Sequence, residues 1–280
     1  MNGKRNREHA ALPAASATDA HLTLGGDPIT RIAERIGQTT LSAHYRAALS
    51  ERVPTLRATL PQDLSLHYAV KANPMPAVVG HIAASVNGLD VASIGEMQVA
   101  LDAGVAPRDI SFAGPGKRDA ELRAAVAAGI TLNAESHAEI ERAARAGDEL
   151  GITPQVAIRV NPDYELKSSG MKMGGGPRQF GIDAEIVPDV LRAVRDMGVH
   201  FRGFHIFGGS QNLRQESLIE TQDATFALAR RLAADVEEFD RARCVGGGFG
   251  IPYFPGDEPL QLTQVSENLA ARMAEWRTES

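Results

Sequence analysis

The stretch LHYAVKANPMP, Leu66 to Pro76, decides the fold, because a largely apolar run ends there in a lysine and then breaks at Asn73 and Pro74. Aromatic and β-branched residues favour a strand, and the Asn-Pro pair ends it. We therefore predict that Lys71 lies at the end of a buried strand. A charged lysine in that place is costly unless it gains an anionic partner, a lowered pKa or a covalent bond.

Two interpretations of Lys71 are open from this stretch alone. The side chain could reach out of the strand end into water, as long basic side chains often do. Alternatively, a Schiff base with an aldehyde cofactor would remove the charge and hold the amine where the strand meets a cleft. The rest of the chain favours the second interpretation.

Six further β-like runs follow the first, and alanine-rich helical stretches separate them. The strands are predicted at residues 66–73, 88–93, 110–115, 130–136, 155–162, 203–210 and 243–250. Helices are predicted at residues 29–37, 42–60, 76–86, 95–104, 118–129, 136–151, 184–198 and in the last segment from residue 267. The first four strands begin 20 to 22 residues apart, which indicates parallel βαβ units in an open sheet or a barrel.

Polar residues and glycines gather where these predicted strands end. They are Lys71, Asn73, Ser93, Gly114, Asn133, Glu135, Arg159, Asn161, Ser210 and the run Gly246–Gly250. In a barrel such ends converge on one mouth, where loops after the seventh and eighth strands often hold a phosphate. The GGGFG run follows the seventh strand, and its amides could approach a phosphate or could simply form a tight turn.

Composition excludes several classes of protein. The 280 residues are 43% hydrophobic and 23% charged, with a net charge of −6 and scattered basic residues, so we expect neither nucleic-acid nor membrane binding. The one cysteine, Cys244, cannot form an internal disulfide and is expected in the core. No group of cysteine or histidine residues has the spacing of metal ligands in the sequence. This use of cysteine fits a protein of the reducing cytoplasm. Residues 1–27 are predicted to be a disordered tail and residues 28–280 the folded domain.

Four motifs carry a family resemblance: YAVKANP, LDVAS followed by GE, HIFGGSQ, and CVGGGFGIPY. In this order and spacing the chain resembles the pyridoxal-phosphate-dependent decarboxylases with the alanine-racemase fold, relatives of ornithine, diaminopimelate and arginine decarboxylases. The resemblance covers roughly residues 45–260. The run SSGMKMGGGPRQFGI further resembles a subgroup of exopolysaccharide or exosortase-associated and carrier-protein-linked pathways.

The resemblance implies an α/β fold with a TIM-like barrel and a role for each motif residue. Lys71 would hold pyridoxal 5'-phosphate as an internal aldimine, and Ser210 with the loop Gly246, Gly247, Gly248, Phe249 and Gly250 would hold its phosphate. Asp90, Glu96 and Arg159 match other polar positions of the family. Each has a plainer alternative: Asp90 pairing with a nearby base, Glu96 favouring a helix amino end, and Arg159 in a structural ion pair.

Phe207 is a departure from the family pattern. Many members have a histidine three residues before the motif serine, where it stacks on the pyridine ring, whereas this chain has Phe207 there and His205 two residues earlier. Alternation along a strand places both side chains on one face, so either could reach the ring. Phenylalanine would keep the stacking but not the polarity. His205 is also open to a plainer reading as a core histidine with its hydrogen bonds satisfied.

The family's Glu-Pro-Gly-Arg motif is absent, since Glu258, Pro259 and Leu260 do not match it. We therefore expect a carboxyl-terminally truncated barrel of about seven of eight strands, without the family's β-domain and with two unpaired edges. The implied function is decarboxylation of a diaminopimelate-like or ornithine-like acid or a carrier-tethered amino acid, in enzymes that are homodimers at full length. An inactive cofactor-binding protein and a racemase-like enzyme remain alternatives.

Overall fold

The computed structural model describes residues 15–17, 21–164, 171–172, 179–234 and 244–278. Its main sheet is parallel, with the strand order β13-β11-β8-β7-β6-β5-β4 and with β10 paired to β8 outside that path. The strands are β4 His67–Ala69, β5 Gly88–Val91, β6 Ile110–Phe112, β7 Thr131–Ala134, β8 Gln155–Asn161, β10 Ile182–Asp183, β11 His200–Ile206 and β13 Cys244–Val245. Each of the seven predicted strand ranges overlaps a strand of this sheet, but the first and the last are shorter than predicted, because β4 ends at Ala69 and β13 at Val245.

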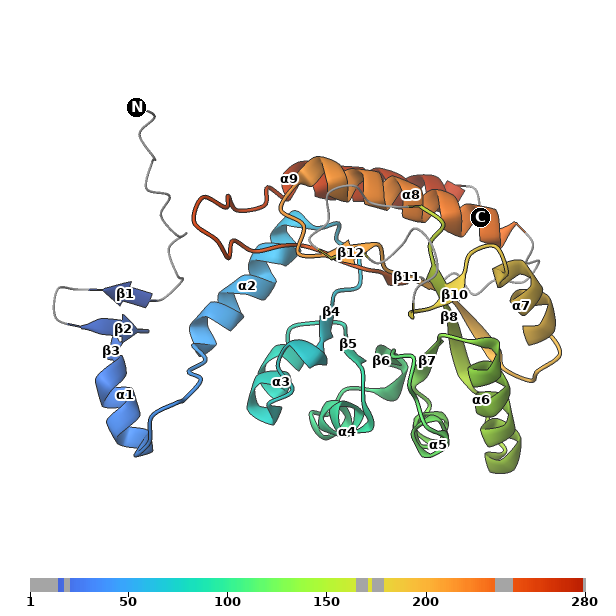
Figure 1. The fold of residues 1–280 in the computed structure, drawn as a ribbon, viewed down its shortest axis with the longest axis horizontal. Coiled ribbons are helices and arrows are strands. Elements are labelled where there is room, and N and C mark those ends of the chain that lie inside the picture. The colour runs from blue at the N-terminus through green and yellow to red at the C-terminus, as the bar shows by residue number, and fades with distance from the viewer. Residues whose placement is uncertain (1–14, 18–20, 165–170, 173–178, 235–243, 279–280) are drawn as a thin grey trace.

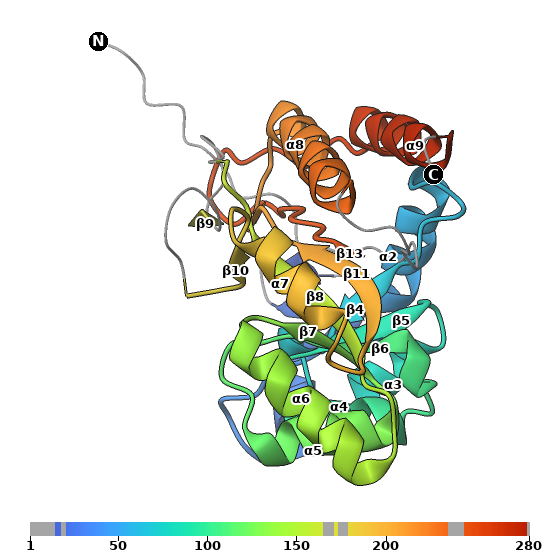
Figure 2. The same ribbon diagram turned by 90° about the vertical axis from the view of Figure 1, so that its right-hand side faces the viewer.

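Helices cover the sheet on two sides, with α3 to α6 along one side and α8 and α9 along the other (Figures 1 and 2). They are α2 Arg46–Thr59, α3 Pro76–Ala83, α4 Ile94–Asp102, α5 Asp119–Ala128, α6 His137–Leu150, α7 Val187–Val194, α8 Gln215–Ala233 and α9 Thr263–Thr278. Short 3-10 turns, η1 Val70–Ala72 and η2 Pro107–Asp109, flank two strands. Helix α8 was not among the predicted helices.

Local sequence signals explain where several of these helices begin and end. Ser93 and Ser136 accept hydrogen bonds from the amides of Glu96 and Glu139 at the starts of α4 and α6. Gly129 and Gly151 end α5 and α6 in the left-handed conformation. Alternating strands and helices of this kind bury apolar residues in two clusters, one around β4 to β7 and one around β8, β11 and α7 to α9.

The sheet is an incomplete (β/α) barrel, as predicted. Among the described residues, β4 and β13 stand at the two ends of the strand order and do not pair with each other. Helix α9 nevertheless reaches the chain beside β4. Ser266 Oγ donates to the carbonyl of Thr59 over 2.5 Å, and Arg277 pairs with Asp63. Helix α9 thus joins α8 to the end of α2 although the strands leave an open edge.

Part of the segment predicted to be a disordered tail has secondary structure. Strands β1 Ala15–Ala17, β2 Leu22–Leu24 and β3 Asp27–Pro28 form a small antiparallel sheet, followed by α1 Ile29–Ile36. Gly25 and Gly26 both have positive φ and make the turn between β2 and β3. The other residues of that prediction, 1–14 and 18–20, lie outside the described part. Within that part, no helix combines the length and hydrophobicity needed to cross a membrane.

Candidate cofactor site

Lys71 lies just past the carboxyl end of β4, not on a strand as predicted. The strand ends at Ala69, and η1 turns the chain so that the residue is exposed. The turn forms because Asn73 donates its amide to the carbonyl of Val70 and its Oδ1 accepts from the amide of Met75. No hydrogen bond or ion pair joins Lys71 to another described residue, so its amine is free for a ligand.

Asp90 begins a row of hydrogen bonds across neighbouring strands. Its Oδ1 accepts from Ser111 Oγ over 2.7 Å, Ser111 Oγ accepts from Asn133 Nδ2 over 3.0 Å, and His67 Nδ1 lies 3.2 Å from Asp90 Oδ1. Burial opposes ionisation of Asp90, but its bonds to His67 and Ser111 and the nearby positive charge prevail, so its pKa is lowered. The predicted pairing of Asp90 with a base is confirmed; its partner is His67.

His205 and Arg159 are register partners on β11 and β8. Burial and then the charge of Arg159 lower the pKa of His205 to about 4; Lys117 and Lys71 act in the same direction. His205 is therefore neutral near pH 7. Its buried Nδ1 has no hydrogen-bond partner among the described residues, which is unlike a satisfied core histidine.

Arg159 makes the structural ion pair that was one of its two interpretations. Its Nη1 donates to Glu135 Oε1 over 2.8 Å, and its guanidinium lies 4.8 Å from the ring centre of Phe180. Arg159 is also the register partner of His205, and its charge lowers the pKa of that histidine, so the two residues belong to one polar cluster. The ion pair and a role towards a ligand are therefore compatible.

The loops after β11 and β13 pack backbone against backbone. Asn212 donates its amide to the carbonyl of Gly248 over 3.0 Å, and Gly250 donates to the carbonyl of Asn212 over 2.8 Å. Gly248 has φ +67, and a Cβ there would lie 2.6 Å from the carbonyl oxygen of Gly209. A Cβ on Gly250 would lie 2.9 Å from Asn212. These two glycines are needed for the loops to approach each other.

Gly247 is different from its neighbours, since it is exposed and a Cβ there would meet only the Phe249 ring, at 3.8 Å. Phe249 forms an isolated bridge with Asn212, and Ser210 ends strand β12 Gly209–Ser210, which pairs with β9 Met171–Lys172. Ser210 and Gly247 thus lie on adjoining loops at the carboxyl ends of β11 and β13. The amide of the exposed Gly247 and the hydroxyl of the half-buried Ser210 are donors of the kind that suit a phosphate.

Phe207 packs on this glycine loop. A Cβ built on Gly246 would lie 2.1 Å from Phe207 Cδ2, so only glycine fits beneath the ring. The amide of Gly246 donates to the carbonyl of Ile206 over 3.0 Å and continues the pairing of β13 with β11. The aromatic side chain is half-buried, with a hydrophobic surface beside the candidate phosphate loop. The side chain of Cys244, predicted to lie in the core, is outside the described part.

Glu96 takes the plainer of its two roles in the structure. Its Oε2 accepts from the amide of Ala92 over 2.8 Å, and its own amide donates to Ser93 Oγ over 3.2 Å. This reciprocal capping pair begins α4.

Sequence reasoning missed a buried charge cluster at the ends of β6 and β7. Lys117 Nζ donates to Glu139 Oε1 over 2.7 Å and to the carbonyls of Gly114 and Asn133. The side chains of Lys117 and Glu139 are only 1% and 2% exposed, and burial raises the pKa of Glu139 although Lys117 opposes the shift. The available signal was the set of charged residues directly after predicted apolar strands, of which Glu135 was noted but given no role.

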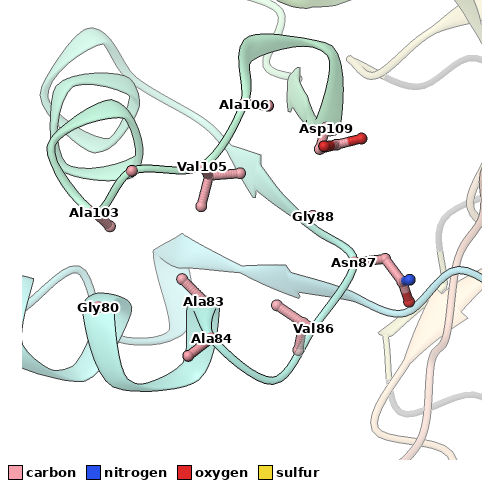
Figure 3. Close-up of a pocket in the computed structure, with 11 residues that line it drawn as sticks. Gly80, Ala83, Ala84, Val86, Asn87, Gly88, Ala103, Val105, Ala106 and Asp109 are labelled. Atoms are coloured by element: carbon pink, nitrogen blue, oxygen red, sulfur yellow. The ribbon is translucent and has the colours of Figure 1, made fainter.

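The structure also has a hollow of about 300 Å³ at the opposite, amino end of the strands (Figure 3). It is lined mainly by small residues at the ends of α3 and α4 and before β5 and β6: Gly80, Ala83, Ala84, Val86, Asn87, Gly88, Ala103, Gly104, Val105, Ala106 and Asp109. This hollow is separate from the candidate site, because Lys71 and the glycine loop follow the carboxyl ends of their strands.

The residues at the carboxyl ends fit a phosphorylated aldehyde. They provide a free amine on Lys71, exposed donors around Gly247, and an unsatisfied buried nitrogen on His205. The charges of Arg159 and Lys71 both lower the pKa of His205, and Arg159 is also its register partner on the neighbouring strand. The negative charge of Asp90 opposes this shift of the His205 pKa, so all four predicted site residues influence one another.

Comparisons with known proteins agree with this fit. Residues 46–279 match the family described as "Pyridoxal-dependent decarboxylase, pyridoxal binding domain". The L-glutamyl-[BtrI acyl-carrier protein] decarboxylase of Niallia circulans is 34% identical over 85% of this chain and 54% of its own length. The diaminopimelate decarboxylase of Aquifex aeolicus is 31% identical over 92% of this chain and 62% of its own length.

Solved structures of decarboxylases are also similar to this chain. The crystal structure of Helicobacter pylori diaminopimelate decarboxylase complexed with L-lysine superposes with a TM-score of 0.76 at 27% identity, covering 86% of this chain and 62% of that one. The chain therefore spans between about half and two thirds of the length of these relatives. It belongs to the pyridoxal-dependent decarboxylase family, whose pyridoxal-binding domain it contains, and the cofactor of that family is pyridoxal phosphate.

Proposed function

We propose that this chain forms the cofactor-binding part of an amino-acid decarboxylase and holds pyridoxal phosphate through the amine of Lys71. The observation that carries the proposal is the position of Lys71, which is exposed and free beyond the carboxyl end of β4, at the same edge of the parallel sheet as the loops after β11 and β13. A free amine in this place suits an aldehyde, because an imine forms when the lone pair of the amine nitrogen attacks the carbonyl carbon.

Other residues would bind and orient the cofactor. Ser210 and the exposed amides near Gly247 would donate to its phosphate, with Gly246, Gly248 and Gly250 shaping the loop and Phe249 bracing it. The Phe207 ring beside this loop would support the flat face of the pyridine ring. Arg159 and His205 would provide positive charge and a neutral nitrogen at its edge.

When bound, pyridoxal phosphate draws electrons from the bond to the α-carboxylate, so that carbon dioxide leaves and the α-carbon is then protonated. The protein's contribution is orientation and charge. Asp90, kept ionised by His67 and Ser111, balances the cations that surround His205. Burial keeps His205 neutral near pH 7, so its Nδ1 can accept or donate one hydrogen bond according to its tautomer.

We propose an amino acid as substrate, either free and diaminopimelate-like or tethered to a carrier protein. The names of the relatives support both, since one acts on a carrier-bound glutamyl group and others on diaminopimelate. The sequence prediction of a carrier-linked subgroup agrees with the first of these. Four expectations from the sequence remain predictions: homodimer formation, a cytoplasmic location, the absence of nucleic-acid and membrane partners, and the domain limit at residue 28.

The test is an absorbance spectrum of the purified chain with added pyridoxal phosphate, before and after borohydride. We expect a band that borohydride abolishes, and a pyridoxyl adduct that peptide mass spectrometry places on Lys71. Lys71→Ala should lose both. Lys71→Arg is the matched control, because it keeps the positive charge but has no primary amine, and it should lose both as well. An adduct on another residue, or a reducible band in Lys71→Arg, would refute the assignment.

Product analysis then separates the possible reactions. Carbon dioxide released from a free or carrier-bound amino acid supports a decarboxylase. Inversion at the α-carbon without release of carbon dioxide would indicate a racemase-like activity instead. A Lys71 adduct without turnover of either kind would indicate a binding function.

A further inference from the structure

Glu135 is the most highly connected buried carboxylate near the candidate site. It follows β7 directly, and its side chain is 2% exposed. Its Oε1 accepts from the amide of Gly114 over 2.6 Å and from Arg159 Nη1 over 2.8 Å, and its Oε2 accepts from the amide of Gly181 over 3.1 Å. One carboxylate therefore joins the loop after β6, the loop before β10 and a side chain of β8.

Arg159 is held on two sides as a result. Glu135 binds its guanidinium at one edge, and the Phe180 ring lies 4.8 Å from the guanidinium carbon. Gly181 completes the contact, because a Cβ there would lie 2.9 Å from the carbonyl oxygen of Arg159, and its φ of +78 suits glycine. A long arginine side chain has many rotamers, so a buried partner is needed to keep it in one orientation.

We propose that Glu135 is a positioning residue of the cofactor site, which fixes the Arg159 guanidinium beside His205 and so sets the affinity for pyridoxal phosphate. This inference rests on the proposed function. Glu135 acts through Arg159 and does not itself touch the cofactor.

A neighbouring carboxylate provides a matched control. Glu139 has an equally buried side chain and lies four residues further along. Its Oε1 accepts from Lys117 Nζ, and its Oε2 accepts from the backbone amide of Glu135 over 3.5 Å, so its partners are a lysine and a backbone amide and not Arg159. Loss of the Glu139 carboxylate should weaken the fold without releasing Arg159. The two glutamates thus separate a positioning effect from a general loss of stability.

The experiment measures the dissociation constant for pyridoxal phosphate in the 280-residue chain by titrating the borohydride-sensitive band, and in parallel the melting temperature without cofactor. Glu135→Gln should raise the dissociation constant about tenfold, as expected for a lost charge-assisted hydrogen bond to a ligand-binding arginine. Glu139→Gln should lower the melting temperature but change the dissociation constant less than about threefold. Phe180→Leu, which leaves every carboxylate in place, should raise the constant by a smaller factor than Glu135→Gln.

The decisive comparison is made in an Arg159→Met background. There, Glu135→Gln and Phe180→Leu should have no further effect on the dissociation constant, because the residue they position is gone. The inference is overturned if either change weakens binding by the same factor with and without Arg159, or if Glu135→Gln leaves the dissociation constant unchanged in the wild-type background. A wild-type chain without a reducible band would overturn both this inference and the proposed function, whereas a normal wild-type band with an unaffected Glu135→Gln variant would overturn this inference alone.

Discussion

Replacing Gly248 by alanine should destabilise the protein by about 2–3 kcal/mol. The left-handed conformation at φ +67 costs an L-residue about 1–2 kcal/mol. The new Cβ would lie 2.6 Å from the carbonyl oxygen of Gly209, so one of the two loops must move. That movement breaks the hydrogen bond from Asn212 to the carbonyl of Gly248, which contributes about 1 kcal/mol.

Gly247→Ala is the matched control for this change, since the two glycines are neighbours in the same loop. A Cβ on Gly247 would meet only carbons of the Phe249 ring, at 3.8 and 3.9 Å, and no positive φ is required there. Its effect on the free energy of unfolding should stay within about 0.5 kcal/mol. Gly247→Ala should weaken the binding of pyridoxal phosphate more than it destabilises the fold, because the added methyl group would stand where we place the phosphate.

Equilibrium unfolding in urea measures both variants against the wild type, and titration of the reducible band measures the affinity. Equal free energies of unfolding for Gly247→Ala and Gly248→Ala would refute the packing argument for these loops. An unchanged dissociation constant for pyridoxal phosphate in Gly247→Ala would refute the position of the phosphate.

Two further predictions concern buried charge. His205 has a pKa of about 4 in the folded protein and about 6.5 when unfolded, so the unfolded chain binds more protons between these two pH values. The free energy of unfolding should therefore fall by about 3 kcal/mol as the pH is lowered from 6.5 towards 4. His205→Gln should remove this part of the acid loss in urea titrations at several pH values, and identical pH profiles for the two proteins would contradict the assignment. Lys117→Met should cost about 3–5 kcal/mol because it leaves the Glu139 carboxylate buried without its partner, while Lys117→Met with Glu139→Leu should recover most of that loss. A thermodynamic cycle of the single and double variants measures this coupling, and additive losses would argue against it.

The strand positions could be predicted from the sequence because each strand–helix unit repeats at a nearly constant interval. Parallel strands buried on both faces give short apolar runs, and glycine or asparagine marks where they end. Helix α8 was harder, since its long segment mixes apolar residues with charges whose partners lie on α9. The sheet before α1 was missed because its strands are too short to show a periodicity.

The candidate site was only partly accessible from sequence. Motif residues such as Lys71 and the glycine run could be found by their spacing, but the exposure of Lys71 depends on a 3-10 turn that the apolar pattern conceals. Lys117 and Glu135 could not be given partners, because their contacts lie 22 and 24 residues away on other elements. Such pairs become visible only when the ends of different strands are brought together.

The contact between α9 and the end of α2 has a consequence for how the chain folds. Ser266 and Thr59 are 207 positions apart, and Arg277 and Asp63 are 214 apart. At a synthesis rate of about 5–20 residues per second, β8 is complete roughly 6–23 seconds before Arg277 is made. During that interval the strands from β4 to β8 are present without the helix that binds the end of α2 and the segment leading into β4. Folding during synthesis therefore includes a stage in which this segment lacks its partner, and a chaperone that shields it should raise the yield of folded protein.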